Sequence, residues 1–298
     1  MRPGFAARIV APTIFVVMWA SGFVVARGVR PFVDPDLFLV ARFALTALVF
    51  ALVAAAARRP WPGARDWTMH LLVGGVQYGG YLGAVYWAVA HGLSAGVAAL
   101  IAALQPPITA IVAARMLRER VPMQVIAGLL VGFAGVTMVV APHLGGGAGG
   151  FPPLAVVVAF AGTLAVTGGM ILQKTHLAAA DLMVANVLQN IGAAIFSLAV
   201  VLLLGEHRWV GAPSLYGWLA YAVLGLSGVA GPLFIWLMRR GEAARTTSLL
   251  FLVPALSALQ AWLLFGDTLG PVQMLGFAVA LGGVILARGR RGRPIGEA

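Results

Sequence analysis

The chain has 298 residues, of which 61% are hydrophobic and only 10% are charged, and its mean hydropathy is +0.97. Soluble domains average about 45–50% apolar and about 25% charged residues, so this composition excludes an ordinary soluble enzyme. Disorder is excluded for the opposite reason, because the chain has ample apolar surface to bury. The chain contains no cysteine, which excludes disulfides and thiolate metal sites.

Ten stretches are apolar enough to cross a bilayer, which takes about 20 residues per helix. In chain order the predicted spans are 9–29, 36–57, 68–90, 94–115, 121–142, 153–174, 182–205, 214–238, 246–266 and 271–288. The first span is too long for a signal peptide and no small-residue cleavage site follows it. We therefore expect an all-α integral membrane protein with ten transmembrane helices.

The basic residues predict the orientation of these spans. If the N-terminus is cytoplasmic, sixteen of the twenty Lys and Arg residues lie in inner segments and only Arg27, Arg30 and Arg208 lie in outer ones. This bias follows the positive-inside rule and predicts a multi-pass protein of the cell (inner) membrane with both termini cytoplasmic. The net charge of +11 is then a contact for anionic lipid at the cytoplasmic loops, and its distribution argues against nucleic-acid binding.

The sequence also matches itself when it is shifted by 148 residues. Pro106 then falls on Pro254 and Gly135 falls on Gly283. Each copy holds five spans, an odd number, so the copies must cross the membrane in opposite senses, as in transporters with inverted repeats. The predicted parts are a first repeat (1–143), a Gly-rich loop (144–152), a second repeat (153–290) and a basic tail (291–298). Chance similarity between Ala- and Leu-rich helices is the alternative explanation.

Three stretches of the chain resemble the EamA-type drug/metabolite transporters. They are WASGFVVARG (Trp19–Gly28), AVAHGLSAGVAALIAALQPPITAIVAARMLRER (Ala88–Arg120) and RRGEAARTTSLLFLVPALSALQAWLLFGD (Arg239–Asp267). The resemblance implies two inverted five-helix halves, alternating access, and a central cavity lined by spans 1, 3, 4, 6, 8 and 9. Members of this family export amino acids, other metabolites or cationic drugs, so the resemblance implies a small-molecule substrate without naming it.

The third span has a packing face and a polar face. Glycines recur every four residues from Gly75 to Gly83, which suits close helix contact. Gln77, Tyr78 and Tyr81 lie on a different face near the middle of the span. Polar groups at this depth face a cavity or another helix. We expect these three side chains to line the cavity; hydrogen bonds to neighbouring helices are the alternative.

Two further spans carry candidate substrate contacts. Trp19 lies near the middle of the first span, where tryptophan is unusual, and could stack on an aromatic or flat cationic ligand. The alternative for Trp19 is a core tryptophan bonded to a carbonyl. Thr167 in the sixth span lies at a matching depth and could donate or accept a hydrogen bond.

Prolines interrupt the fourth span and its repeat mate. Gln105 and Thr109 lie on one side of the fourth span, next to Pro106 and Pro107, and Pro254 is the mate in the ninth span. Proline removes a backbone donor and kinks a helix. Gln105 is therefore a predicted substrate contact, and the three prolines are predicted gating kinks. A static kink is the alternative.

Arg42 is the one charge well inside a predicted span. It could anchor a substrate carboxylate or form a structural bond to helix-end carbonyls or headgroups. All nine acidic residues lie at span ends or in loops, so no midplane carboxylate is available for proton coupling. We expect no cofactor and no metal site, and the sequence leaves the oligomeric state open.

These features favour an exporter of amino acids or related small amphiphiles over an enzyme. Alternatives are a multidrug or organic-cation exporter, a channel-like permease, and a carrier of phosphorylated metabolites or sugar nucleotides. The last would need several cationic groups, and only Arg42 is available. Gly225–Gly228 has the GxSG form of intramembrane serine proteases, but a nucleophilic Ser227 needs a base and no histidine falls inside a span.

Overall fold

The computed structural model describes residues 10–116, 123–140, 152–177, 181–239, 250–267 and 269–287. Within these ranges the regular secondary structure is helical. No strand is formed there, and the β-type pairing is limited to one isolated bridge between Val33 and Trp209. The all-α class is therefore confirmed. The loop at 144–152, apart from Pro152, and the basic tail at 291–298 lie outside the described residues.

The helices follow the predicted spans closely. The first half contains α1 (Ala11–Val29), α2 (Pro35–Ala56), α3 (Ala64–Gly74), the π-helical η2 (Gly75–Gly80), α4 (Tyr81–Ala90), α5 (Ala95–Ala102), α6 (Gln105–Met116) and α7 (Met123–Val140). The second half contains α8 (Pro153–His176), α9 (Leu182–Leu204), α10 (Pro213–Ala220), the π-helical η4 (Tyr221–Ala230), α11 (Gly231–Arg239), the 3₁₀ turn η5 (Leu250–Leu252), α13 (Val253–Phe265) and α14 (Pro271–Ala287).

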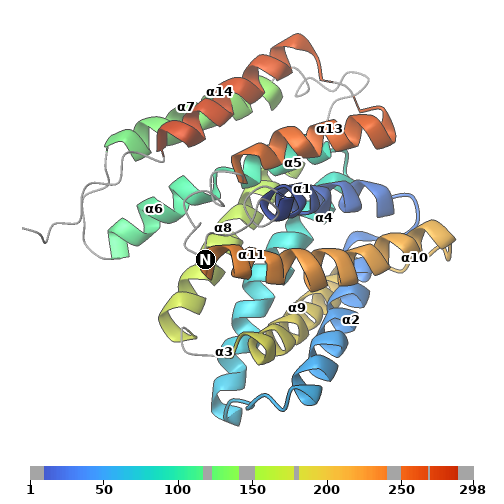
Figure 1. The fold of residues 1–298 in the computed structure, drawn as a ribbon. Coiled ribbons are helices and arrows are strands. Elements are labelled where there is room, and N and C mark those ends of the chain that lie inside the picture. Colours follow the sequence, from blue (N-terminus) through green and yellow to red (C-terminus); the bar gives the residue numbers. More distant parts are fainter. Residues whose placement is uncertain are drawn as a thin grey trace, which may run out of the picture.

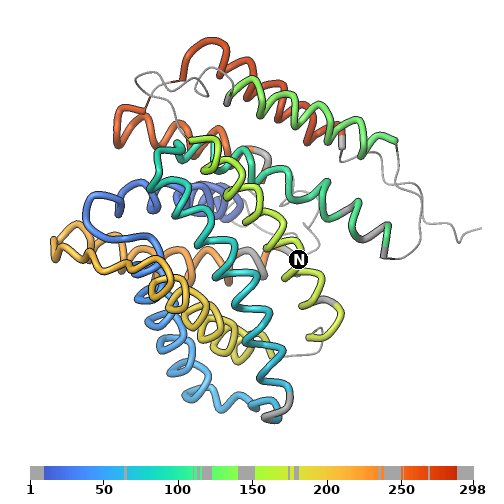
Figure 2. Tube along the Cα trace, turned by 180° about the vertical axis from the view of Figure 1, so that it is seen from behind, coloured from blue at the N-terminus to red at the C-terminus, as the bar shows by residue number. Residues whose placement is uncertain are grey.

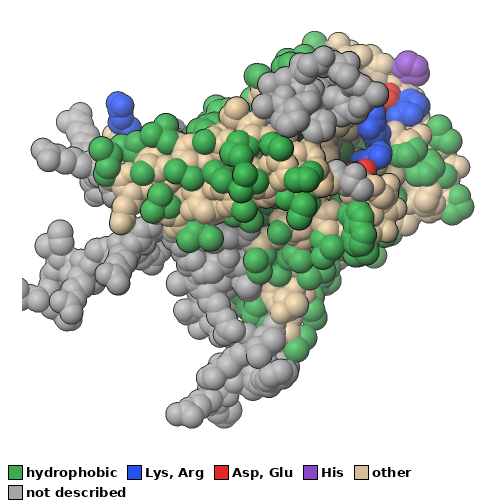
Figure 3. All heavy atoms as spheres, turned by 90° about the horizontal axis from the view of Figure 1, so that it is seen from above, with side chains coloured by type: hydrophobic (Ala, Val, Ile, Leu, Met, Phe, Trp, Pro, Cys, Tyr) green, Lys and Arg blue, Asp and Glu red, His purple; other side chains and the backbone are tan. Residues whose placement is uncertain are grey.

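Five helical segments are long and apolar enough to cross a membrane, and further apolar helices are shorter, at 10–17 residues. Their surface suits lipid: hydrophobic side chains cover much of the face in Figure 3, and charged and histidine side chains gather mainly toward one end. Leu202 and Leu203 near the end of α9 are 75% and 83% exposed. The protein is therefore a multi-pass membrane protein.

Local sequence signals explain where helices begin and end. The first turn of a helix leaves its N–H groups unpaired, so proline, which has no N–H, is well suited to the first position. Proline is the first residue of four helices (α2, α8, α10 and α14). The Asp181 carboxylate accepts the Met183 and Val184 N–H groups at the start of α9. Gly205 and Gly266, with φ of 67° and 72°, end α9 and α13 in the left-handed conformation that glycine adopts without strain.

Helices related by the 148-residue shift pack on each other. α2 contacts its mate α9 and α7 contacts its mate α14; the second pair lies side by side in both views (Figures 1 and 2). The fourth and ninth spans also meet, through α5 and α13. α1 contacts η4, and the corresponding helices α8 and η2 contact each other. Other contacts between the halves pair helices whose mates also meet, such as α4 with α8 and α1 with α11.

Glycine allows the closest of these contacts. A side chain at Gly283 of α14 would collide with the backbone of Gly128 and Gly132 on α7, and one at Gly135 would collide with the backbone of Ala280. Small residues at such positions let helix backbones approach in lipid. Gly128 and Gly132 therefore serve packing within the chain.

Candidate functional site

The fourth span is broken just before its two prolines. α5 ends at Ala102, residues 103–104 form a turn, and α6 starts at Gln105. Pro106 and Pro107 have no N–H to bond the carbonyls four residues earlier, at Ala102 and Ala103. The predicted interruption is present, two to three residues before the prolines that cause it.

The ninth span shows a matching interruption. Pro254 is buried as the second residue of α13, directly after the 3₁₀ turn η5. A 3₁₀ turn leading into a helix often marks a bend. In both the fourth and the ninth span, a new helix therefore begins one residue before a proline, at equivalent positions of the two halves. The two spans contact each other through α5 and α13.

A first polar cluster is made of Gln105, Thr109, Thr167 and Met170 on α6 and α8, together with Gln77 of η2, which packs on α8 at Gly169. Gln105 Nε2 donates to Met170 Sδ at 2.8 Å, and Thr109 Oγ1 donates to Thr167 Oγ1 at 3.5 Å. Thr167 also donates to the Thr163 carbonyl at 2.9 Å. The predicted residues Gln105 and Thr167 therefore both lie at the contact between α6 and α8, and Gln77 packs against the same helix α8.

Gln77 enters this cluster because its backbone lies against a glycine. A Cβ on Gly169 of α8 would lie 2.5 Å from Gln77 Cβ, so only glycine leaves room for η2 there. Gln77 Oε1 is buried and has no hydrogen-bond partner, which leaves a free acceptor.

The two predicted tyrosines lie on either side of the end of η2. Tyr78 and Tyr81 are half-buried and pack against the hydrophobic core. A Cβ on Gly162 of α8 would lie 3.1 Å from the Tyr81 carbonyl oxygen. The wider π-helical turn of η2 rotates these residues relative to an α-helix, and such turns are frequent at functional sites.

A second polar cluster, made of Ser21, Tyr221 and Gln260, joins the equivalent elements α1, η4 and α13. The Ser21 and Tyr221 hydroxyls lie 2.6 Å apart, and Gln260 Nε2 donates to the Val17 carbonyl at 3.1 Å. Gln260 Oε1 is buried without a partner, like Gln77 Oε1. Sequence reasoning missed Tyr221, whose repeat mate is the apolar Val73.

Trp19 and Arg42 are placed differently. Trp19, on α1 two residues before Ser21, is 41% exposed, and its ring lies 5.4 Å from that of Phe15. Arg42 is buried, and its Nη1 donates to the Tyr86 hydroxyl at 3.1 Å, while its Nε has no partner. Arg42 makes no hydrogen bond or ion pair with the other predicted site residues, so the structure does not bring it into either cluster.

Hydrogen bonds and ion pairs of charged side chains connect the two halves at both ends of the molecule. Asp34 accepts hydrogen bonds from Arg208 and from the His207 backbone, and Arg59 pairs with Asp181 at 3.7 Å. Burial favours the neutral form of Asp34, but the hydrogen bonds from Arg208 and His207 outweigh it and hold its pKa below the usual value. Burial raises the pKa of Glu206. These contacts join loops 30–34 and 205–210 at one end, and loop 57–63 and Asp181 at the other.

Among the described residues, Ser227 of the GxSG motif has no base within hydrogen-bond reach. Ser227 Oγ donates to the Ala222 carbonyl at 3.2 Å and accepts a 3.5 Å hydrogen bond from Thr46. Within the described ranges no histidine bonds this hydroxyl, so it has no activating partner there.

Polar clusters inside a helical bundle and proline-broken helices are features of membrane transport proteins. The sequence profile of the EamA-like transporter family matches residues 9–141 and again residues 153–289. The chain therefore belongs to the EamA-like transporter family, whose members are transporters.

Individual proteins are similar over nearly the full length. A probable terminal-alkyne amino-acid exporter of Streptantibioticus cattleyicolor is 29% identical over 294 residues, covering 94% of this chain and 93% of that protein. An uncharacterised transporter of Synechocystis sp. is 26% identical, covering 92% and 87%. A crystal structure with 22% sequence identity superposes with a TM-score of 0.62 and covers 93% of this chain and 95% of that one, which supports the fold.

Proposed function

We propose that this protein exports amino acids or related small amphiphiles by alternating access between two inverted five-helix halves. The observation that carries the proposal is the pair of polar clusters built from equivalent elements: η2, α6 and α8 in one, and η4, α13 and α1 in the other. The double match to the family profile and the contacts between repeat-related helices also support it.

The chemistry of the clusters suits a small zwitterion. Gln77 and Gln260 each keep a buried carboxamide oxygen without a partner, and an ammonium group is a donor that such acceptors can bind. Gln105, Thr167, Tyr78, Tyr81 and Trp19 would supply further hydrogen bonds and apolar contact. Arg42 would donate to a substrate carboxylate through Nε, which has no partner, while Nη1 keeps its bond to Tyr86. The relative that is named as a probable amino-acid exporter favours the same substrate class.

The proline-broken helices would provide the motion. Carbonyls left unpaired before Pro106, Pro107 and Pro254 weaken the helix at these points, so each helix can bend there while its two ends stay packed. Bending of one half at a time would open the clusters alternately to the two sides of the membrane.

Counterflow in proteoliposomes tests the proposal. Vesicles loaded with one unlabelled amino acid at a time, with and without a pH gradient, are given a trace of the same amino acid in labelled form. A carrier accumulates label transiently, and uptake saturates. Flux that rises linearly with concentration and shows no counterflow would contradict a carrier and favour a channel.

A further inference from the structure

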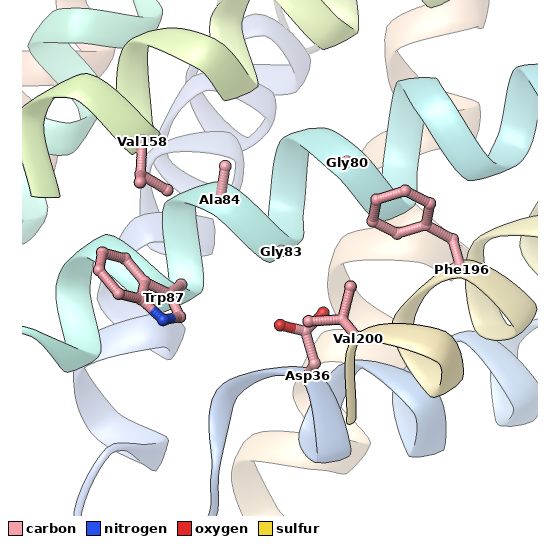
Figure 4. A pocket seen from close by; sticks show the side chains of 8 residues that line it. All are labelled: Asp36, Gly80, Gly83, Ala84, Trp87, Val158, Phe196 and Val200. Atoms are coloured by element: carbon pink, nitrogen blue, oxygen red, sulfur yellow. The ribbon is translucent and has the colours of Figure 1, made fainter. Parts of the chain in front are cut away.

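A pocket of about 290 Å³ lies beside the polar clusters rather than within them. Its walls are the side chains of Asp36, Trp87, Val158, Phe196 and Val200, together with small residues of η2 and α4. In Figure 4 the Asp36 carboxyl group points into the space between Trp87 and Phe196. No member of either cluster lines this pocket, and its volume is at the lower end for small-molecule sites.

Asp36 is buried without a counter-charge. It is 1% exposed, and its Oδ1 has no hydrogen-bond partner. The Ser197 hydroxyl of α9 lies near the carboxyl group without a well-formed hydrogen bond to it. The ion pairs among the described residues involve Asp34, Asp181 and Asp267 instead.

Among the described residues, the surroundings supply no cation to the carboxyl group. Glu206 Oε2 accepts the backbone N–H groups of Asp36 and Leu37, each at 2.9 Å, so that Glu206 caps α2. Arg42, further along α2, bonds Tyr86. A Cβ on Gly83 would lie 3.0 Å from Asp36 Oδ1, so the glycine leaves the space in front of the carboxyl group open.

The lining indicates the class of ligand. A buried carboxylate needs a paired charge, and aromatic rings attract cations at their faces. Hard metal cations take six or more oxygen ligands, whereas the lining provides one carboxylate amid apolar surface. An amino acid would bring a carboxylate of its own, for which the lining side chains include no cation.

We propose that this pocket binds a small organic monocation, an ammonium group carried on an aromatic or alkyl body without a carboxylate, with Asp36 as its counter-ion. Phenethylamine and phenylalanine form a matched pair of probes, because they differ only by the carboxylate. Equilibrium binding of radiolabelled phenethylamine to the purified full chain in detergent is the measurement.

We expect saturable binding that Asp36→Asn weakens at least tenfold and that Asp66→Asn, an exposed acid on α3, leaves unchanged. Val200→Phe, which fills the pocket and keeps the carboxylate, should also weaken binding at least tenfold. Phenylalanine should compete at least tenfold less well than unlabelled phenethylamine. Size-exclusion profiles identify any variant that fails to fold. If Asp36→Asn or Val200→Phe fails to fold, the other variant still tests the proposal.

Three results would overturn the proposal: no saturable binding to the unmodified chain, equal binding by the Asp36→Asn protein, or equal competition by phenylalanine. Gln105→Ala separates this pocket from the first polar cluster. It should leave phenethylamine binding unchanged, and a loss as large as that of Asp36→Asn would place the ligand in the cluster instead.

Discussion

At the residue scale, most hydroxyls inside the spans donate to a carbonyl of their own helix, whereas the carboxamide oxygens of Gln77 and Gln260 have no partner. Thr163 and Thr167 donate to the carbonyls four residues earlier, a common way to satisfy a hydroxyl in a helix. Gln77 and Gln260 instead keep a buried oxygen free. A buried acceptor without a partner is costly, so a donor bound at either of these two positions would stabilise the complex.

Gln77→Ala should therefore raise the apparent KM for the transported substrate about 3- to 10-fold, the range expected for one lost hydrogen bond. Gln124→Ala, an exposed glutamine on α7, is the matched control and should leave KM unchanged. The measurement is saturable uptake into proteoliposomes. Equal KM values for the Gln77→Ala protein and the unmodified chain would remove Gln77 from the site.

The sequence predicted some of these residues and could not predict others. Gln77, Gln105 and Thr167 stood out because polar groups are rare in apolar spans. Tyr221 was missed because its repeat mate is Val73, so the comparison of the halves gave no signal. Asp36 was placed only at a span end or in a loop, and its burial could not be predicted because it depends on packing by α4 and α9 that no local pattern records.

At the scale of single elements, the helix breaks could be predicted and the π-helical turns could not. A proline removes a specific N–H, so a break close to it follows directly. η2 and η4 fall at positions related by the 148-residue shift. The sequence could not predict them, because a π-helical turn differs from an α-helical turn by an extra residue and not by its hydropathy. Their positions depend on close contacts such as that of Gly169 with Gln77.

Replacing both Pro106 and Pro107 with alanine should restore the missing N–H groups and straighten the fourth span. We expect the turnover rate to fall severalfold with little change in substrate affinity, because the hinge and not the binding groups is altered. Pro271→Ala, at the first position of α14, is the control. An unchanged maximal rate in the double variant would show that the break is static.

Adjacent glycines on α14 give a test of helix packing. Gly283→Ala places a methyl group against the backbone of Gly128 and Gly132, whereas Gly282 has open space around it. We expect Gly283→Ala to destabilise the protein by about 1–3 kcal/mol through overpacking, seen as a lower melting temperature in detergent. Gly282→Ala should be neutral or slightly stabilising. Equal melting temperatures would show that α7 and α14 do not pack as described.

At the scale of the whole molecule, composition and hydropathy sufficed for the all-α membrane class, and the 148-residue shift pointed to two related halves. The substrate could not be predicted, because selectivity depends on how side chains from α1, α6, α8 and α13 meet in space. The structure adds direct packing of α2 on its mate α9 and of α7 on its mate α14. This packing supports the proposed inverted repeat.

The opposite insertion of the two halves is tested by labelling single cysteines, for which the cysteine-free chain is a ready background. Pro60 and His207 lie in the loops that join the second and third spans of each half. His207→Cys should react with a membrane-impermeant maleimide in intact cells, and Pro60→Cys should react only after permeabilisation. Reaction of both cysteines from the same side would contradict the inverted repeat and the alternating-access mechanism that depends on it.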